Sequence, residues 1–170
     1  TADSKGRQLW RVSGSSVERV TSIVSDEAEL DPRHLIVSDN KLFFVGEEHP
    51  YGRELWVYDG TARMVKDINT SGHGNLGGFF TDYKGRLFFS AGTSSTGVEL
   101  WISDGTSDGT KQVCDIWPGN ISSGIVSPVI IGDTLYFTAN DGTGTEIWRL
   151  ISSDGQPVKF TDKPGMGADC

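Results

Sequence analysis

The chain has 170 residues, and a hydrophobic share of 36% is enough for one ordered domain with a core. Its net charge of -8 argues against a nucleic-acid partner, because such binding depends on clustered Lys and Arg side chains. No apolar run approaches the roughly 20 residues of a membrane span. The sequence does not begin with Met, so we expect a processed or excised piece.

A tryptophan motif recurs along the chain. Its copies read GRQLW, GRELW, GVELW and GTEIW, and their tryptophans, Trp10, Trp56, Trp101 and Trp148, follow one another at intervals of 46, 45 and 47 residues. A second landmark, LFF or LYF, follows a polar turn at residues 42–44, 87–89 and 135–137. A repeat of this length is typical of the blades of a β-propeller.

Each repeat is predicted to form four short strands. In residues 69–116 we expect strands at 79–82, 86–91, 98–103 and 111–116, joined by turns whose Gly and Asp residues accept positive φ. The chain has no 3.6-residue apolar period, so no helix is expected. The LFF segments are apolar on both faces, which means that each small sheet must be covered on both sides. We therefore predict an all-β fold, a β-propeller of four-stranded antiparallel blades.

The predicted blades follow one another in chain order. Residues 1–24 make a half blade with strands at 7–12 and 17–23, residues 25–68, 69–116 and 117–163 make full blades, and residues 164–170 start the next blade or form a tail. A ring of fewer than about four blades is not expected. Further blades should therefore come from the same protein or from copies of this chain. The alternative is a β-trefoil, whose lectin branch carries a Gln-x-Trp motif like residues 8–10.

The third copy, GVELWISDGTSDGT at 97–110 with VCDIWPG at 113–119, resembles the ELWxSDGTxxGT repeats of large secreted or surface-attached proteins, mainly bacterial. The resemblance covers nearly the whole chain. The first copy departs from it with Gln8 in place of Glu, and the fourth has SDGQ at 153–156. The resemblance implies propeller-like blades and a secreted or cell-surface location. It implies no known reaction, because the shared residues belong to the scaffold.

Several polar residues also recur at equivalent positions. They are Glu54, Glu99 and Glu146 in the tryptophan motif, and Asp67, Asp115 and Asp162 further along each repeat. A catalytic pair is not needed in every blade, so we expect these carboxyl groups to be hydrogen-bonded parts of the scaffold. The four repeated tryptophans are expected in the core for the same reason. Cys114 and Cys170 either form a disulfide or remain thiols.

Function is expected where the copies differ, in the loops between second and third strands and between blades, which share one face of a propeller. The candidate ligand-binding residues are His49, Tyr51, His73, Asn75, Asp82, Trp117 and Asn120. The two aromatic rings could stack on a sugar, and the amide and carboxyl groups could pair with vicinal hydroxyls. The histidines have no Cys or His at short spacing, which favours surface residues over metal ligands.

Acidic residues gather in the same loops. Asp26, Glu27, Glu29, Asp31, Glu47 and Glu48 could supply oxygens to Ca²⁺. The run lacks the spaced ligand order of a calcium loop, so a solvated edge is favoured and no cofactor is expected.

The sequence carries no nucleophile elbow, phosphate loop or metal triad. We predict a non-catalytic extracellular or cell-surface binding or adhesion module that recognises a glycan or a protein through the loop face. One alternative is a secreted glycan-active enzyme that uses loop carboxylates. Another is a structural spacer in a large surface protein. We expect no nucleic-acid partner and no membrane-spanning segment.

Overall fold

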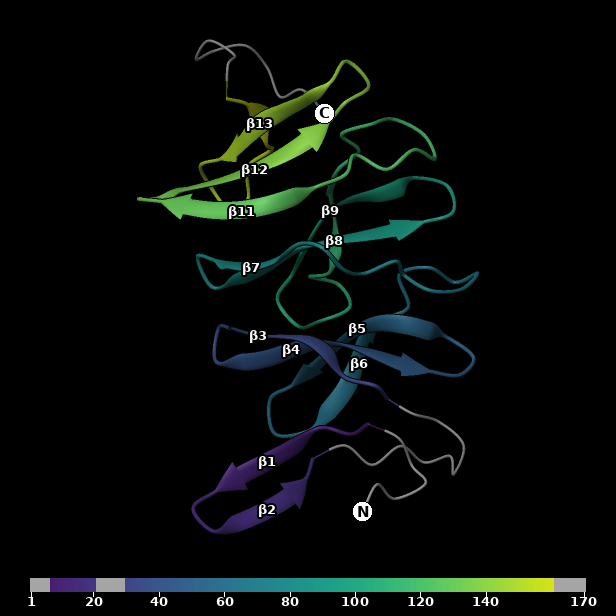
Figure 1. The fold of residues 1–170 in the computed structure, drawn as a ribbon, viewed down its shortest axis with the longest axis vertical. Coiled ribbons are helices and arrows are strands. Elements are labelled where there is room, and N and C mark those ends of the chain that lie inside the picture. Colours follow the sequence, from purple (N-terminus) through teal and green to yellow (C-terminus); the bar gives the residue numbers. More distant parts are fainter. Residues whose placement is uncertain (1–6, 21–29, 161–170) are drawn as a thin grey trace.

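The computed structural model describes residues 7–20 and 30–160, and in these residues the chain is all β. Fourteen strands form four antiparallel sheets, and the described residues contain no helix. The sheets follow one another along the long axis of the molecule and do not close into a ring (Figure 1). The prediction of an all-β fold is therefore confirmed. No helix with the length and hydropathy of a membrane span occurs in the described part of the chain.

The strands follow the repeat in chain order. The hairpin contains β1 (Trp10–Ser13) and β2 (Ser16–Arg19), and the first sheet contains β3 (Arg33–Ser38), β4 (Lys41–Glu48), β5 (Gly52–Tyr58) and β6 (Ala62–Lys66). The second sheet contains β7 (Phe80–Tyr83), β8 (Arg86–Thr93), β9 (Gly97–Ser103) and β10 (Lys111–Cys114). The third sheet contains β11 (Val126–Ile131), β12 (Thr134–Asn140), β13 (Thr145–Leu150) and β14 (Val158–Lys159). The strands expected at 79–82, 86–91, 98–103 and 111–116 match β7 to β10 closely.

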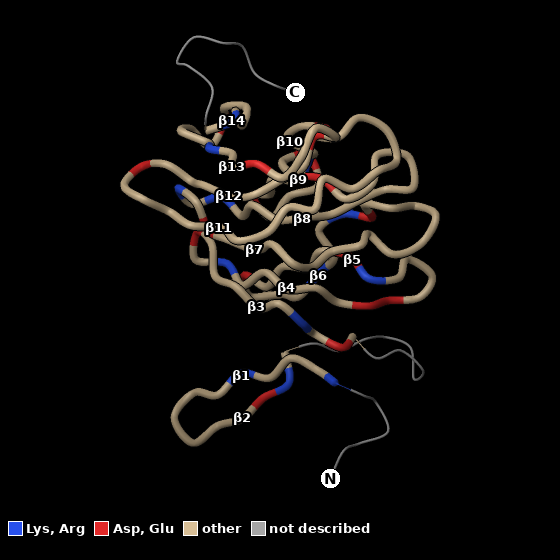
Figure 2. The backbone as a smooth tube through the Cα atoms, turned by 45° about the horizontal axis from the view of Figure 1, so that its top comes forward, with Lys and Arg blue, Asp and Glu red and all other residues tan. Residues whose placement is uncertain are grey.

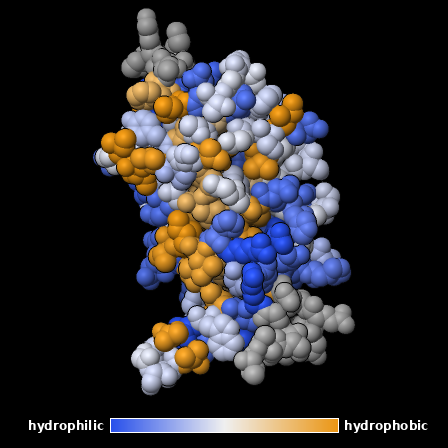
Figure 3. Space-filling model, viewed as in Figure 1, coloured by the Kyte–Doolittle hydropathy of each residue, from blue (hydrophilic) through white to orange (hydrophobic). Residues whose placement is uncertain are grey.

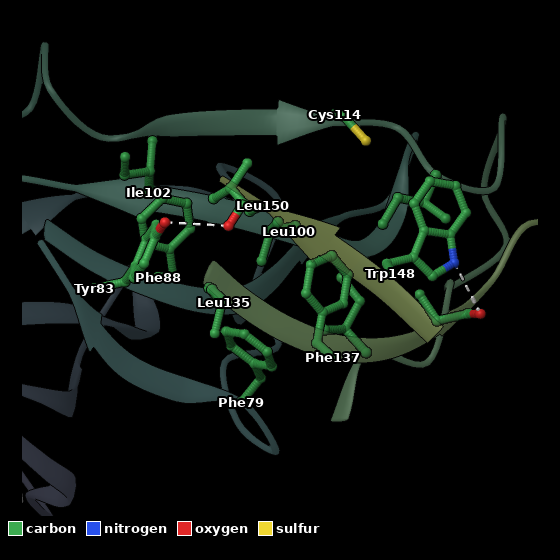
Figure 4. Close-up of a cluster of buried hydrophobic side chains, with 13 residues drawn as sticks. Phe79, Tyr83, Phe88, Leu100, Ile102, Cys114, Leu135, Phe137, Trp148 and Leu150 are labelled. Carbon is green, nitrogen blue, oxygen red and sulfur yellow. Dashed lines mark hydrogen bonds between the residues drawn. The ribbon is translucent and has the colours of Figure 1, made fainter. Parts of the chain in front are cut away.

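Neighbouring sheets pack through two different faces, because side chains alternate along each strand. The Leu face of a sheet carries the residue at the position of Leu55 or Leu100, and the Trp face carries the repeated tryptophan. Leu55 of the first sheet shares a buried cluster with Trp101 of the second. Leu100 of the second sheet shares the next cluster with Trp148 of the third, as Figure 4 shows. The core thus consists of Leu-face to Trp-face interfaces between successive sheets.

The first strands of the three full sheets, β3, β7 and β11, lie side by side (Figures 1 and 2). His34 of β3 stacks on Phe80 of β7 with ring centroids 5.6 Å apart. The hydroxyl of Tyr83 on β7 donates to the carbonyl of Leu150 on β13 at 3.1 Å. These contacts join the first sheet to the second and the second sheet to the third.

The Asp-Gly-Thr motif forms the turn between β9 and β10. Oδ1 of Asp104 accepts the backbone N–H of Thr106 at 2.8 Å, and the hydroxyl of Thr106 accepts the N–H of Gly109 at 2.9 Å. A Cβ on Gly109 would lie 2.1 Å from Oδ1 of Asp104, so a larger residue there would displace the carboxyl group that holds the turn. The carbonyl of Thr110 accepts a 2.8 Å bond from Nζ of Lys66 on β6. The turn therefore also joins the first and second sheets.

Two repeated residues differ from the prediction at the ends of the described chain. Trp10 was expected in the core but is 54% exposed, because no sheet formed by the described residues packs against the Trp face of the hairpin. Glu146 was expected as buried scaffold but is exposed. The predictions of core burial for Trp10 and of scaffold burial for Glu146 are therefore wrong. Asp162 lies outside the described residues.

The repeated aspartates are less completely buried than the repeated glutamates. Asp67 and Asp115 are partly exposed, and in each of them Oδ1 is buried without a hydrogen-bond partner. Cys114 is disulfide-bonded, and Cys170, the other cysteine of the sequence, lies outside the described residues. The residues at 164–170, expected as a tail or a further blade, also lie outside them.

Candidate functional site

The loops that differ between repeats meet at one edge of the molecule, on the right in Figure 1. This loop edge consists of the loops at 49–51, 94–96 and 141–144 and the connections at 67–79 and 115–125. The hydroxyls of Ser71 and Ser94 lie 3.5 Å apart, and Oγ of Ser122 accepts the N–H of Val98 at 2.9 Å. Loops inside a sheet and connections between sheets therefore lie side by side, as the sequence predicts.

Two repeated glutamates bind the connections between the sheets through hydrogen bonds to their backbone. Oε2 of Glu54 accepts the N–H of Ile68 at 3.0 Å, and Oε2 of Glu99 accepts the N–H of Ile116 at 3.0 Å. Both side chains are fully buried. Each therefore ties its own third strand to the connection that leads to the next sheet, and the prediction of a hydrogen-bonded scaffold is confirmed for both.

Burial raises the pKa of Glu54 and of Glu99 to about 7, because a carboxylate loses its hydration inside the protein. The neighbouring carboxyl groups of Asp67 and Asp115 raise these pKa values further. The backbone N–H groups act in the opposite direction but do not outweigh burial. Both glutamates therefore titrate near neutral pH although no solvent reaches them.

The first group of candidate residues lies where the first sheet leads into the second. Tyr51 is 42% exposed, and His49, His73 and Asn75 are exposed as well. Nδ1 of His73 accepts the N–H of Arg53 at 3.0 Å. A Cβ on Gly52, the residue after Tyr51, would lie 2.8 Å from the same nitrogen. The connection that carries His73 and Asn75 is thus seated against the loop that carries His49 and Tyr51.

The second group lies one repeat further along, where the second sheet leads into the third. Asn120 is exposed, whereas Trp117 is only partly exposed. A Cβ on Gly142 would lie 3.2 Å from Nε1 of Trp117, so the indole rests on the loop at 141–144. Trp117 braces the third sheet with part of its ring, and the remainder is open. The predicted ligand-binding residues therefore form two groups rather than one.

Asp82 does not join either group. It lies on β7, next to the last residue of that strand, and accepts a 2.5 Å hydrogen bond from Oγ of Ser38 on β3. Because β7 runs away from the loop edge, its end lies by the turn at 84–85 on the other edge. Asp82 therefore joins two first strands.

Two of the candidate calcium residues that the structure describes, Asp31 and Glu47, are paired with arginines. Asp31 accepts a 2.7 Å bond from Nε of Arg33, and this bond holds the pKa of the Asp31 carboxyl below its usual value. Glu47 accepts a 2.9 Å bond from Nε of Arg53. Glu48 ends β4, and Asp26, Glu27 and Glu29 lie outside the described residues. Within residues 7–20 and 30–160, no group of three or more His, Cys, Asp or Glu side chains could hold a metal ion.

Sequence reasoning missed two cavities at the other edge of the molecule. One of about 520 Å³ lies between the hairpin and the first sheet and is lined by Arg11, Asp39, Lys41, Tyr58 and Asp59, among others. A second of about 320 Å³ lies between the second and third sheets, lined in part by residues 104, 108–109 and 153–156. The one sequence feature that the two cavities share is an aspartate at the same position of the repeat, Asp59 in the first cavity and Asp104 in the second. The sequence could not predict the cavities themselves, because each forms between two neighbouring units.

A comparison of the chain with protein-family models and with curated proteins found no match. Function is therefore inferred from the residues of the loop edge and from the repeat itself.

Proposed function

We propose that the chain is part of a β-propeller and acts outside the cell, or on its surface, as a non-catalytic binding or adhesion module. Three successive sheets have their strands in chain order, and the first and second each turn the Leu face toward the following sheet, which supports blades of a propeller. The adjacent first strands β3, β7 and β11 support a radial arrangement, with these strands innermost. The resemblance to ELWxSDGTxxGT repeats supports the location.

One observation carries the proposal of binding rather than catalysis. Glu54 and Glu99, the carboxyl groups of the tryptophan motif in the first and second sheets, accept backbone N–H groups and are closed off from solvent. The side chains that vary between repeats, such as Tyr51 and Asn75, are exposed at that edge. These two carboxyl groups thus belong to the scaffold, and the varied polar and aromatic groups remain available to a ligand.

A neutral glycan is the ligand class that suits these groups best. An exposed ring such as that of Tyr51 stacks on the apolar face of a sugar, and the amides of Asn75 and Asn120 pair with hydroxyls. The net charge of -8 disfavours a polyanion. A protein ligand at the same edge is the alternative, because a broad polar face can serve either kind of partner.

The test is a neutral-glycan array followed by calorimetry on the best ligand. We expect a dissociation constant in the micromolar to millimolar range, lost in Tyr51→Ala while the unfolding midpoint stays unchanged. Val37→Ala, at an exposed residue of β3 away from the loop edge, is the control and should bind as the parent does. Hydrolysis of the ligand, abolished by a single carboxylate substitution, would instead indicate a glycan-active enzyme. No binding in either assay would leave the protein-ligand or spacer role.

A further inference from the structure

The two ends of the described chain expose opposite halves of the interface that is repeated inside it. Within the chain, the Leu face of the first sheet packs against the Trp face of the second, and the Leu face of the second packs against the Trp face of the third. Leu55 and Leu100 are both completely buried in this way. The same rule predicts what each open end face would accept.

The Leu face of the third sheet is open. Ile147 stands at the repeat position of Leu55 and Leu100 but is 48% exposed. The strand register puts Tyr136 and Val129 on the same face, because Tyr136 pairs with Arg149, two residues from Ile147, and Val129 pairs with Tyr136. The rings of Tyr136 and Phe160 lie 5.6 Å apart on it. Arg149 lies on the same face, with its guanidinium 5.8 Å from the centroid of the Phe160 ring. The face is thus mainly aliphatic and aromatic, and no other described sheet covers it.

The Trp face of the hairpin is open in the same way. Val12 and Val17 are cross-strand partners, and Trp10 lies two residues before Val12, so the three side chains share one face. All three are exposed. Leu9, on the opposite face, is buried in a cluster with Phe44 and Trp56 of the first sheet. Among the described residues, the hairpin therefore has its Leu face covered and its Trp face, which also carries Arg19, uncovered.

The exposed apolar residues follow this pattern. Figure 3 shows hydrophobic groups at the hairpin and also along the side of the molecule opposite the loop edge. Most of the large hydrophobic residues that are exposed belong to the hairpin, to β3 beside it, or to the third sheet. Neighbouring apolar side chains exposed on one face mark an interaction surface.

We propose that copies of this chain associate head to tail, with the Leu face of the third sheet of one copy packed on the Trp face of the hairpin of the next. We choose a second copy as the partner because the two faces left open by the described residues are of the two kinds that pack on each other inside the chain. Ile147 of one copy would contact Trp10 of the next, as Leu100 is clustered with Trp148. A contact between unlike faces closes into a ring or extends into a filament, according to the rotation between copies.

The experiment is sedimentation velocity on the full chain over a range of concentrations. We expect the parent to associate, and Ile147→Arg and Trp10→Asp each to weaken association about 30-fold or more, as for a central interface residue. An equimolar mixture of the two variants should form a dimer, because one copy still has an intact Leu face and the other an intact Trp face. Circular dichroism should show that both variants are folded, since both residues are exposed.

Ile121→Arg is the matched control. Ile121 is 48% exposed, as Ile147 is, but it lies in the connection at 115–125. This variant should associate as the parent does. A parent that stays monomeric up to millimolar concentration would overturn the proposal. Self-association of Trp10→Asp but not of Ile147→Arg would overturn it too, because two Leu faces would then meet each other. So would a mixture of the two variants that does not dimerise.

Discussion

Replacement of Glu99 with Ala removes the acceptor that ties the third strand of the second sheet to its connection. The N–H of Ile116 loses a 3.0 Å bond and has no solvent to replace it, because Glu99 is completely buried. The N–H of Ser123 loses a 3.1 Å bond to Oε1 but keeps the carbonyl of Val98, also at 3.1 Å. One backbone donor is therefore left without a partner, and a second is weakened.

The expected loss follows from these two effects. A buried donor without a partner costs about 1–3 kcal/mol. The space left by the side chain adds about 1 kcal/mol for the lost contacts. We therefore expect Glu99→Ala to lower the free energy of unfolding by about 2–4 kcal/mol.

Urea unfolding, followed by tryptophan fluorescence and circular dichroism, measures this loss. Glu146→Ala is the control, because Glu146 has the same repeat position but is exposed. Its free energy of unfolding should change by no more than about 0.5 kcal/mol. Equal losses in the two variants would show that burial and the bonds to the connection do not set the role of the repeated glutamate.

Two further predictions concern the core and pH. Trp101→Ala should lower the free energy of unfolding by about 3–5 kcal/mol, the range for a buried aromatic residue. Trp10→Ala, at an exposed copy of the same motif, should lower the free energy of unfolding by less than about 1 kcal/mol when the chain is monomeric. Equal losses for the two variants in urea unfolding would contradict the assignment of Trp101 to the core and of Trp10 to the surface. The pKa of Glu54 and of Glu99 is raised from 4.5 to about 7 in the folded chain. The folded state therefore holds protons that the unfolded state releases, and the resulting stabilisation is complete below about pH 4.5 and is lost as the pH rises toward 7. Urea unfolding between pH 4.5 and 7 should therefore show a loss of stability with rising pH that is smaller in the double variant Glu54→Gln/Glu99→Gln, and an unchanged loss would contradict the raised pKa values.

The sequence by itself determined the local structure of the repeats. The strands β7 to β10 begin and end within two residues of their predicted bounds. The Asp-Gly-Thr turn forms where it is predicted because its bonds, from Asp104 to Thr106 and from Thr106 to Gly109, join residues close in the chain. Alternating side chains and turn residues act over a few positions, so a single repeat contains all the information that its own strands need.

Only the tertiary structure decided which copies of a repeated residue are buried. Trp10 and Trp101 share a motif, and so do Glu146 and Glu99, yet the first of each pair is exposed and the second is buried. In the same way, Trp117 proved to rest on the loop at 141–144, and Asp82 proved to bond to Ser38. Burial of a sheet face depends on a neighbouring sheet that comes from a distant part of the chain. Copies of one motif therefore have a different environment in the end units of the described chain than in the units between them.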